Sequence, residues 1–155
     1  METTMKAQDV IKGSLAKCYL EIDGERIVFA NAINLEATME KNKTTAPVLG
    51  KTGKVNITST WEGSGSMTLH YNSSEMRTLL YKFKATGEET YFDIQVENEA
   101  PGSSVGKQVV TLKNCTIDGG VLAKFDADAE YLEEDVEFTF DDWEIPTKFE
   151  PLPRG

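Results

Sequence analysis

The chain has 155 residues, of which 26 are acidic and 16 basic, and its formal net charge is −10. This length suits one domain with a hydrophobic core of its own. The surplus of acids argues against binding to DNA phosphates or an anionic membrane, because both attract Lys and Arg. The segment from Met1 to Lys12 lacks the apolar stretch of a secretory signal, and no apolar run is long enough to span a membrane.

Alternation of apolar and polar residues in the first half of the chain predicts antiparallel strands. Residues 16–22 form the first strand, Asp23-Gly24 marks a tight hairpin turn, and residues 25–29 return. Residues 33–40 and 55–62 then alternate as two sides of one ribbon, with an apolar face and a polar face.

Two glycine-containing segments interrupt this pattern. Residues 41–54 are basic and contain Pro and Gly, so we predict a loop that is long for a hairpin, of the kind that is usually functional or mobile. The Gly-Ser-Gly sequence at 63–65 predicts a bulge or bend before a strand at 66–71.

The second half of the chain begins with a change of period. Apolar residues spaced at three and four predict an amphipathic helix at about 73–84, with Ser73 or Ser74 as its N-cap and Gly87 just beyond its end. Alternation then returns, and we predict strands at 91–97, 107–117, 121–130 and 135–143.

The predicted fold is therefore mainly β, an antiparallel β-sandwich or barrel-like architecture with one flanking helix. We expect a single domain over residues 1–155. It has an N-terminal arm at 1–14, the long loop at 41–54 and an extended C-terminal tail at 146–155, where three prolines occur.

The residues give no reason to predict a catalytic, cofactor or metal site. A single histidine, His70, cannot supply a Ser/His/Asp set. An acidic cluster could serve a hydrolase, but a solvated face is favoured, and Asp126, Asp128 and Glu130 could hold a cation only weakly. Cys18 and Cys115 lack a CxxC spacing. Reduced thiols are the default for this pair, with a disulfide left open.

Five segments carry a resemblance to a known family, and the last of them is the most specific. They are LEATMEKNK (35–43), GSGSMTL (63–69), YFDIQV (91–96), VTL (110–112) and AKFDADAEYLEEDVEFTFDDWEIP (123–146). Together they make the chain resemble the tail tube proteins of contractile-tailed phages, PBSX-type prophages and phage-tail-like bacteriocins. The 41–54 loop and the N-terminal residues match this pattern less well.

The resemblance implies a structural role without a cofactor. Six copies would form a ring whose joined sheets line a channel, and rings would stack into a tube inside a contractile sheath. The expected partners are other copies, the sheath protein, the baseplate or tube initiator, the tail terminator and a tape-measure protein in the lumen. DNA would pass without specific binding in a phage, or ions in a bacteriocin. The expected location is a virion or phage-tail-like particle.

On that model, alternation assigns two sets of residues. The predicted lumen-facing set is Asn34, Glu36, Thr38, Glu40, Asn56, Thr58, Thr60 and Glu62. The predicted inter-ring contact joins basic residues of the loop to an acidic turn, namely Lys41, Lys43, Lys51 and Lys54 with Glu133, Glu134 and Asp135. The alternatives are a monomeric β-sandwich carbohydrate-binding module, a hydrolase, and another tail component with the same fold.

Overall fold

The computed structural model describes residues 7, 11, 16–28 and 32–151. Apart from residues 7 and 11, the predicted N-terminal arm lies outside them, as do Phe29 and residues 152–155. In chain order, the elements are β1 (Lys17–Ile22), β2 (Glu25–Val28), β3 (Ala32–Pro47), β4 (Lys54–His70), α1 (Glu75–Thr86), β5 (Phe92–Ala100), β6 (Gly106–Gly119), β7 (Glu133–Phe140) and β8 (Asp142–Thr147).

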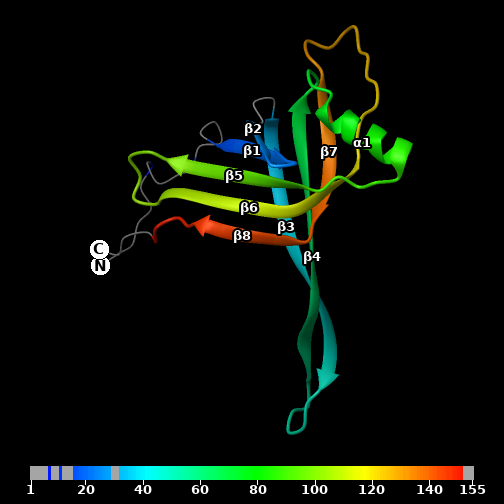
Figure 1. The fold of residues 1–155 in the computed structure, drawn as a ribbon. Helices are drawn as coiled ribbons and strands as arrows, with labels where there is room; N and C mark the ends of the chain where they lie inside the picture. Colours follow the sequence, from blue (N-terminus) through cyan, green and yellow to red (C-terminus); the bar gives the residue numbers. More distant parts are fainter. Residues whose placement is uncertain (1–6, 8–10, 12–15, 29–31, 152–155) are drawn as a thin grey trace.

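Two antiparallel sheets cross each other and share one strand (Figure 1). Sheet A contains β2, β1, β5, β6 and β8, and sheet B contains β6, β7, β4 and β3. Figure 1 shows the strands of sheet A running across the direction of β3, β4 and β7. This is the orthogonal form of sheet packing, in which a bent strand turns the corner. The sheets do not close, and β2 and β3 are the free edges of the strand order. The predicted sandwich of antiparallel strands is therefore confirmed.

The corner between the sheets lies where Asn114 and Asp141 meet. Asn114 has a positive φ of 54°, and its Nδ2 donates a hydrogen bond of 2.9 Å to Asp141 Oδ1. Asp141 N in turn donates to Lys113 O at 3.3 Å, between the end of β7 and the start of β8. The predicted single strand at 135–143 is therefore wrong, because the chain changes sheets at this residue. The predicted tail also begins later, since Pro146 and Thr147 still belong to β8.

The core lies between the two sheets and under the first turn of α1. Its buried members are Leu20, Met67, Leu69, Met76, Phe92, Ile94, Leu112, Cys115, Val136, Phe138 and Phe140. Met76 is the buried residue that α1 contributes. The helix ends at Gly87, which has φ 74° and donates its N–H to Phe83 O at 2.7 Å. A left-handed residue at this position is a common helix terminator, so the predicted helix and its stop signal are confirmed.

The glycines at 63 and 65 serve packing, and the predicted bend there is wrong. β4 runs unbroken through both residues, opposite Phe140 and Phe138 of β7. A Cβ on Gly63 would lie 2.3 Å from the Phe140 ring, and one on Gly65 would lie 2.5 Å from the Phe138 ring. Each glycine therefore leaves room for a phenylalanine side chain of the neighbouring strand.

Two further expectations fail, at 41–54 and at 121–130. β3 continues to Pro47 and β4 starts at Lys54, so only residues 48–53 form the hairpin turn. The β-branched Thr44 and Thr45 favour a strand, lysines are common on exposed edge strands, and the glycines of the segment occur only at 50 and 53. In contrast, residues 120–132 contain no strand. Alternation there depends on alanines between acids, and both residue types have low strand propensity.

Candidate functional site: the polar face of sheet B and the hairpin arm

Cross-strand register brings one set of polar side chains together on sheet B. Residues directly opposite in an antiparallel pair share a face. Successive rows across β3, β4, β7 and β6 are Asn34–Thr68–Asp135, Glu36–Ser66–Glu137, Thr38–Ser64–Thr139–Thr116 and Glu40–Glu62. We call these twelve residues the polar face.

Hydrogen bonds tie neighbouring strands together on the polar face. Thr68 Oγ1 donates to Asp135 Oδ1 at 2.8 Å, and the hydroxyls of Thr116 and Thr139 lie 3.3 Å apart. The opposite side of the sheet is the core, since Met67, Val136 and Phe138 are each at most 1% exposed. Sheet B is therefore two-sided, with one dry face and one face in water.

The charge of the polar face has one sign. Its ionisable members are Glu36, Glu40, Glu62, Asp135 and Glu137, and none of its positions carries Lys or Arg. Glu40 lies directly opposite Glu62, a like-charge pairing that destabilises an isolated sheet. The ion pairs found in the described part of the chain lie on other surfaces. The face therefore presents carboxylates, hydroxyls and amides to any solution beside it.

A β-bulge at Ser59 divides the predicted lumen-facing set. Asn42 lies opposite Thr60 and Lys43 lies opposite Thr58, so Ser59 has no partner of its own. Ser59 Oγ donates to Asn42 O at 3.1 Å, and Asn42 Nδ2 donates to Thr60 Oγ1 at 2.9 Å.

Counting pairs across the bulge shows which residues share a face. Thr60 and Glu62 stay on the same side as Glu36 and Glu40, as predicted. Thr58 and Asn56 move to the other side, contrary to the prediction. Nothing in the alternating sequence marks this change of side.

Beyond the bulge, β3 and β4 form an arm that extends past the rest of the sheet, as Figure 1 shows at its lower end. We call residues 41–61 the hairpin arm. Since β7 ends opposite Gly63, the arm is a ribbon of only two strands. The exposed Lys41, Lys43, Lys51 and Lys54 are its charged residues, and it contains no acid. The predicted basic segment is thus an extended hairpin.

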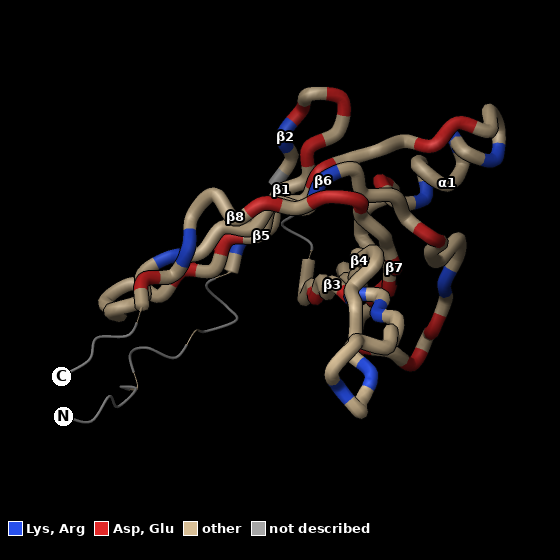
Figure 2. The backbone as a smooth tube through the Cα atoms, turned by 90° about the horizontal axis from the view of Figure 1, so that it is seen from below, with Lys and Arg blue, Asp and Glu red and all other residues tan. Residues whose placement is uncertain are grey.

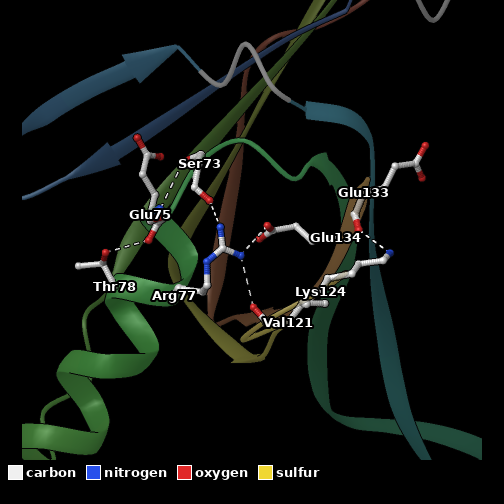
Figure 3. Close-up of polar contacts among 9 residues, drawn as sticks. Ser73, Glu75, Arg77, Thr78, Val121, Lys124, Glu133 and Glu134 are labelled. Carbon is white, nitrogen blue, oxygen red and sulfur yellow. Dashed lines mark hydrogen bonds and ion pairs between the residues drawn. The ribbon is translucent and has the colours of Figure 1, made fainter. Parts of the chain in front are cut away.

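The three acids of the predicted inter-ring turn lie on β7, where alternation puts Glu134 on the face opposite to that of Glu133 and Asp135. Glu134 is 3% exposed and its Oε2 lies 2.8 Å from Arg77 Nη1 of α1 (Figure 3). Arg77 also donates to Ser73 O and Val121 O. Asp135 belongs to the polar face, and Glu133 is half-buried. Glu134 therefore holds the helix against the sheet and is not available to another copy.

Both cysteines are free thiols, which agrees with the reduced state expected from the sequence. Burial raises the pKa of Cys18 to about 11 and that of Cys115 to about 12. Nearby Asp93 adds to the shift at Cys115. Neither thiol is therefore poised as a nucleophile, because the thiolate is the reactive form.

Within the described residues, His, Cys, Asp and Glu form no group arranged to hold a metal ion. In that part of the chain, no helix is both long and apolar enough to cross a membrane.

A two-sheet β fold with a long exposed edge strand offers a template for pairing with another chain. The chain belongs to the family described as phage tail tube protein, whose model matches residues 3–147. Membership places the protein in the tail of a phage or phage-tail-like particle and gives it a structural role. The family match favours the tube over the carbohydrate-binding module and the hydrolase.

Curated relatives come from Bacillus subtilis strain 168. The phage-like element PBSX protein XkdM is 33% identical over 144 residues, which cover 93% of this chain and 95% of the relative. The uncharacterised protein YqbM is 32% identical over 142 residues, which cover 92% and 94% respectively. Both alignments span nearly the whole length of each protein, so the resemblance noted in the sequence is confirmed.

Solved structures with low sequence identity share the fold. A chain of the sheath–tube complex of an extracellular contractile injection system (PVC) has a TM-score of 0.63 at 9% identity, covering 83% of this chain and 87% of its own. The SPP1 tail tube gives 0.63 at 12% identity, with 91% and 80% covered. A chain of the tube-terminating cap of the anti-feeding prophage gives 0.63 at 12%, with 93% and 95% covered.

Proposed function

We propose that six copies close into a ring in which the polar face of sheet B lines a central channel, and that rings stack into a tube. The observation that carries this proposal is the contrast between the two faces of sheet B. One is a packed core, and the other carries five carboxylates per subunit without a Lys or Arg.

The free edge of β3 supports ring closure. β3 is 16 residues long, and among the described strands only β4 pairs with it. An exposed edge of this length is a template for pairing with another strand, and soluble proteins normally cover it. Pairing with the sheet of a neighbouring copy covers the edge and carries the polar face around the ring.

The acid-lined wall suits the passage of DNA or ions. Carboxylates repel phosphates, and hydroxyls and amides offer no fixed positive charge, so a polyanion passes without being held. In this proposal the tube sits inside a contractile sheath, starts at a baseplate initiator, ends at a terminator and holds a tape-measure protein during assembly. The subunit catalyses no reaction.

Six of the eight predicted lumen residues belong to this proposal. The polar face contributes Asn34, Glu36, Thr38, Glu40 and Glu62, and Thr60 continues it into the arm. Asn56 and Thr58 are not included, because the Ser59 bulge puts them on the other side. Lys41, Lys43, Lys51 and Lys54 remain proposed contacts to the next ring.

Electron microscopy of the purified protein at high concentration tests assembly, with the sheath and initiator co-expressed if the subunit alone stays monomeric. Hollow tubes or six-fold rings are the expected result. Monomers alone, even with both partners present, would overturn the proposal.

Charge reversal tests the lining. Particles carrying Glu40→Lys with Glu62→Lys are expected to assemble but to deliver DNA less efficiently, because lysines in the wall retain phosphates. Glu88→Lys is the matched control, since Glu88 is exposed just after α1 and lies outside both sheets. Unchanged delivery by the double variant would refute electrostatic repulsion as the role of this face.

A further inference from the structure

We infer that the tip of the hairpin arm of one copy docks on the loop at residues 120–132 of a second copy stacked end to end with it. The inference rests on the proposed tube. It goes further by identifying an acceptor surface that the sequence did not suggest, because residues 121–130 were expected to form a strand.

The arm and the loop lie at opposite ends of the subunit. Figure 1 shows the turn of the β3–β4 hairpin at the bottom of the long strands and the β6–β7 connection at their top. Copies related by a shift along these strands bring the arm of one against the loop of the next. Such a head-to-tail contact uses two different surfaces and leaves a free one at each end, so it continues indefinitely.

Both surfaces expose large apolar side chains that no described part of the subunit covers. Leu49 at the tip of the arm is 100% exposed. In the loop, Phe125 is 90% exposed and Leu122 is 72% exposed. A few scattered apolar residues on a surface are ordinary, but here the most exposed ones occupy the two ends that stacking brings together.

The loop has a fixed shape, as a docking surface requires. Arg77 Nη1 donates to Val121 O at 3.4 Å, and Lys124 Nζ donates to Glu133 O at 2.7 Å (Figure 3). Tyr71 N donates to Leu132 O at 3.0 Å. These bonds fasten both ends of the loop, so binding a partner costs little ordering entropy.

The charges of the two surfaces are complementary. The arm carries four lysines and no acid, whereas the loop carries Asp126, Asp128 and Glu130 against one lysine, Lys124. Figure 2 shows the basic residues near the tip of the arm and the acidic ones along the loop. Opposite charges across an interface set partner and register more than affinity. A second copy of this chain therefore fits the arm better than a basic partner does.

The Ser59 bulge gives the arm two chemically distinct sides. Beyond it, register puts Ala46, Val55 and Ile57 on the side of the polar face, and Lys43 and Lys54 on the other. A two-stranded ribbon alone is marginally stable in water. An apolar stripe and a basic stripe on one ribbon are typical of a segment that is covered after assembly.

Disulfide trapping tests the contact. The variant Leu49→Cys with Phe125→Cys is assembled into tubes and oxidised, and its bands are compared on a non-reducing gel. The expected result is a ladder of linked subunits that reduction removes. The matched control is Leu49→Cys with Tyr81→Cys, because Tyr81 is 68% exposed on α1. Tubes without a ladder, or an equal ladder in the control, would overturn the inference. Absence of tubes from the unaltered protein would instead refute the proposed function.

A charge swap supplies a second test. Lys51→Glu with Lys54→Glu, at the tip of the arm, is expected to raise the subunit concentration needed for tube growth at least about tenfold, which corresponds to about 1.4 kcal/mol. Adding Asp126→Lys with Asp128→Lys to the same chain is expected to restore growth. Folding of each variant is checked by circular dichroism. A folded swap variant that grows no better than the arm variant alone would contradict the pairing.

Discussion

Replacing Gly65 by alanine tests whether the glycines of β4 exist to accommodate phenylalanine rings. A Cβ at this position would lie 2.5 Å from Phe138 Cζ and 2.8 Å from the backbone oxygen of Glu36. Carbon atoms normally approach to about 3.5–4.0 Å, so the ring has to move by about 1 Å. Phe138 is fully buried, and overpacking of this kind costs about 1–3 kcal/mol. The φ of Gly65 is not positive, so an alanine backbone fits and the loss is steric.

Gly63→Ala is expected to cost less, because the atoms it meets belong to the Phe140 ring, which is 7% exposed at the edge of the core. Ser64→Ala is the matched control, since Ser64 lies between the glycines on the polar face, and we expect a change within about 0.5 kcal/mol. Urea unfolding of the free subunit, followed by circular dichroism, measures all three. In the Gly65→Ala background, Phe138→Leu should cost less than in the wild type by at least about 0.5 kcal/mol. Equal stability of Gly65→Ala and Ser64→Ala would refute the reasoning.

Three further predictions concern the ion pair between Arg77 and Glu134, the two thiols and the hairpin arm. Arg77→Ala is expected to destabilise the subunit by about 3–5 kcal/mol, because it leaves the Glu134 carboxylate buried without its cation. The double variant Arg77→Met with Glu134→Leu should recover most of this loss in the same urea assay. Equal stability of the single and the double variant would argue against a stabilising role of the Arg77–Glu134 ion pair. Burial raises the thiol pKa from 9.0 to about 11 for Cys18 and about 12 for Cys115. As pH rises, the thiols of the unfolded chain therefore ionise before those of the folded subunit. The free energy of unfolding should therefore be constant with respect to these thiols below pH 9 and fall as pH rises toward 12. The double variant Cys18→Ala with Cys115→Ala should show a weaker dependence of this free energy on pH. Deleting residues 44–51 should leave a folded subunit that no longer forms tubes, as size-exclusion chromatography and microscopy would show, and normal tubes would remove the stacking role.

The elements that could be predicted are those in which the alternation of apolar and polar residues matches the alternation of buried and exposed side chains. Val136, Phe138 and Phe140 alternate with polar residues, and β7 buries them as expected. The same register contained a signal that was missed. Glu134 stands two residues before Val136, on the core side of the strand, and a carboxylate there needs an internal cation such as Arg77.

The remaining features depend on contacts that a single sequence does not show. The Ser59 bulge changes the side on which Asn56 and Thr58 lie without changing the alternation of residue types. The loop at 120–132 alternates like a strand, but its small alanines provide too little apolar surface to hold one. The glycines at 63 and 65 predict a bulge or bend, and only the rings of the neighbouring strand show that they serve packing instead.

The shared strand β6 has a mechanical consequence for a tube of this kind. Sheets that only pack face to face are held together by apolar contacts, which are non-directional. Here one strand is hydrogen-bonded in both sheets, and the Asn114–Asp141 bond braces its corner. A force applied along the channel wall therefore passes through the backbone into the outer sheet. In the proposed tube, the two sheets of a subunit therefore resist shear as a single body, and movement is confined to the two-stranded arms that we propose as the contacts between rings.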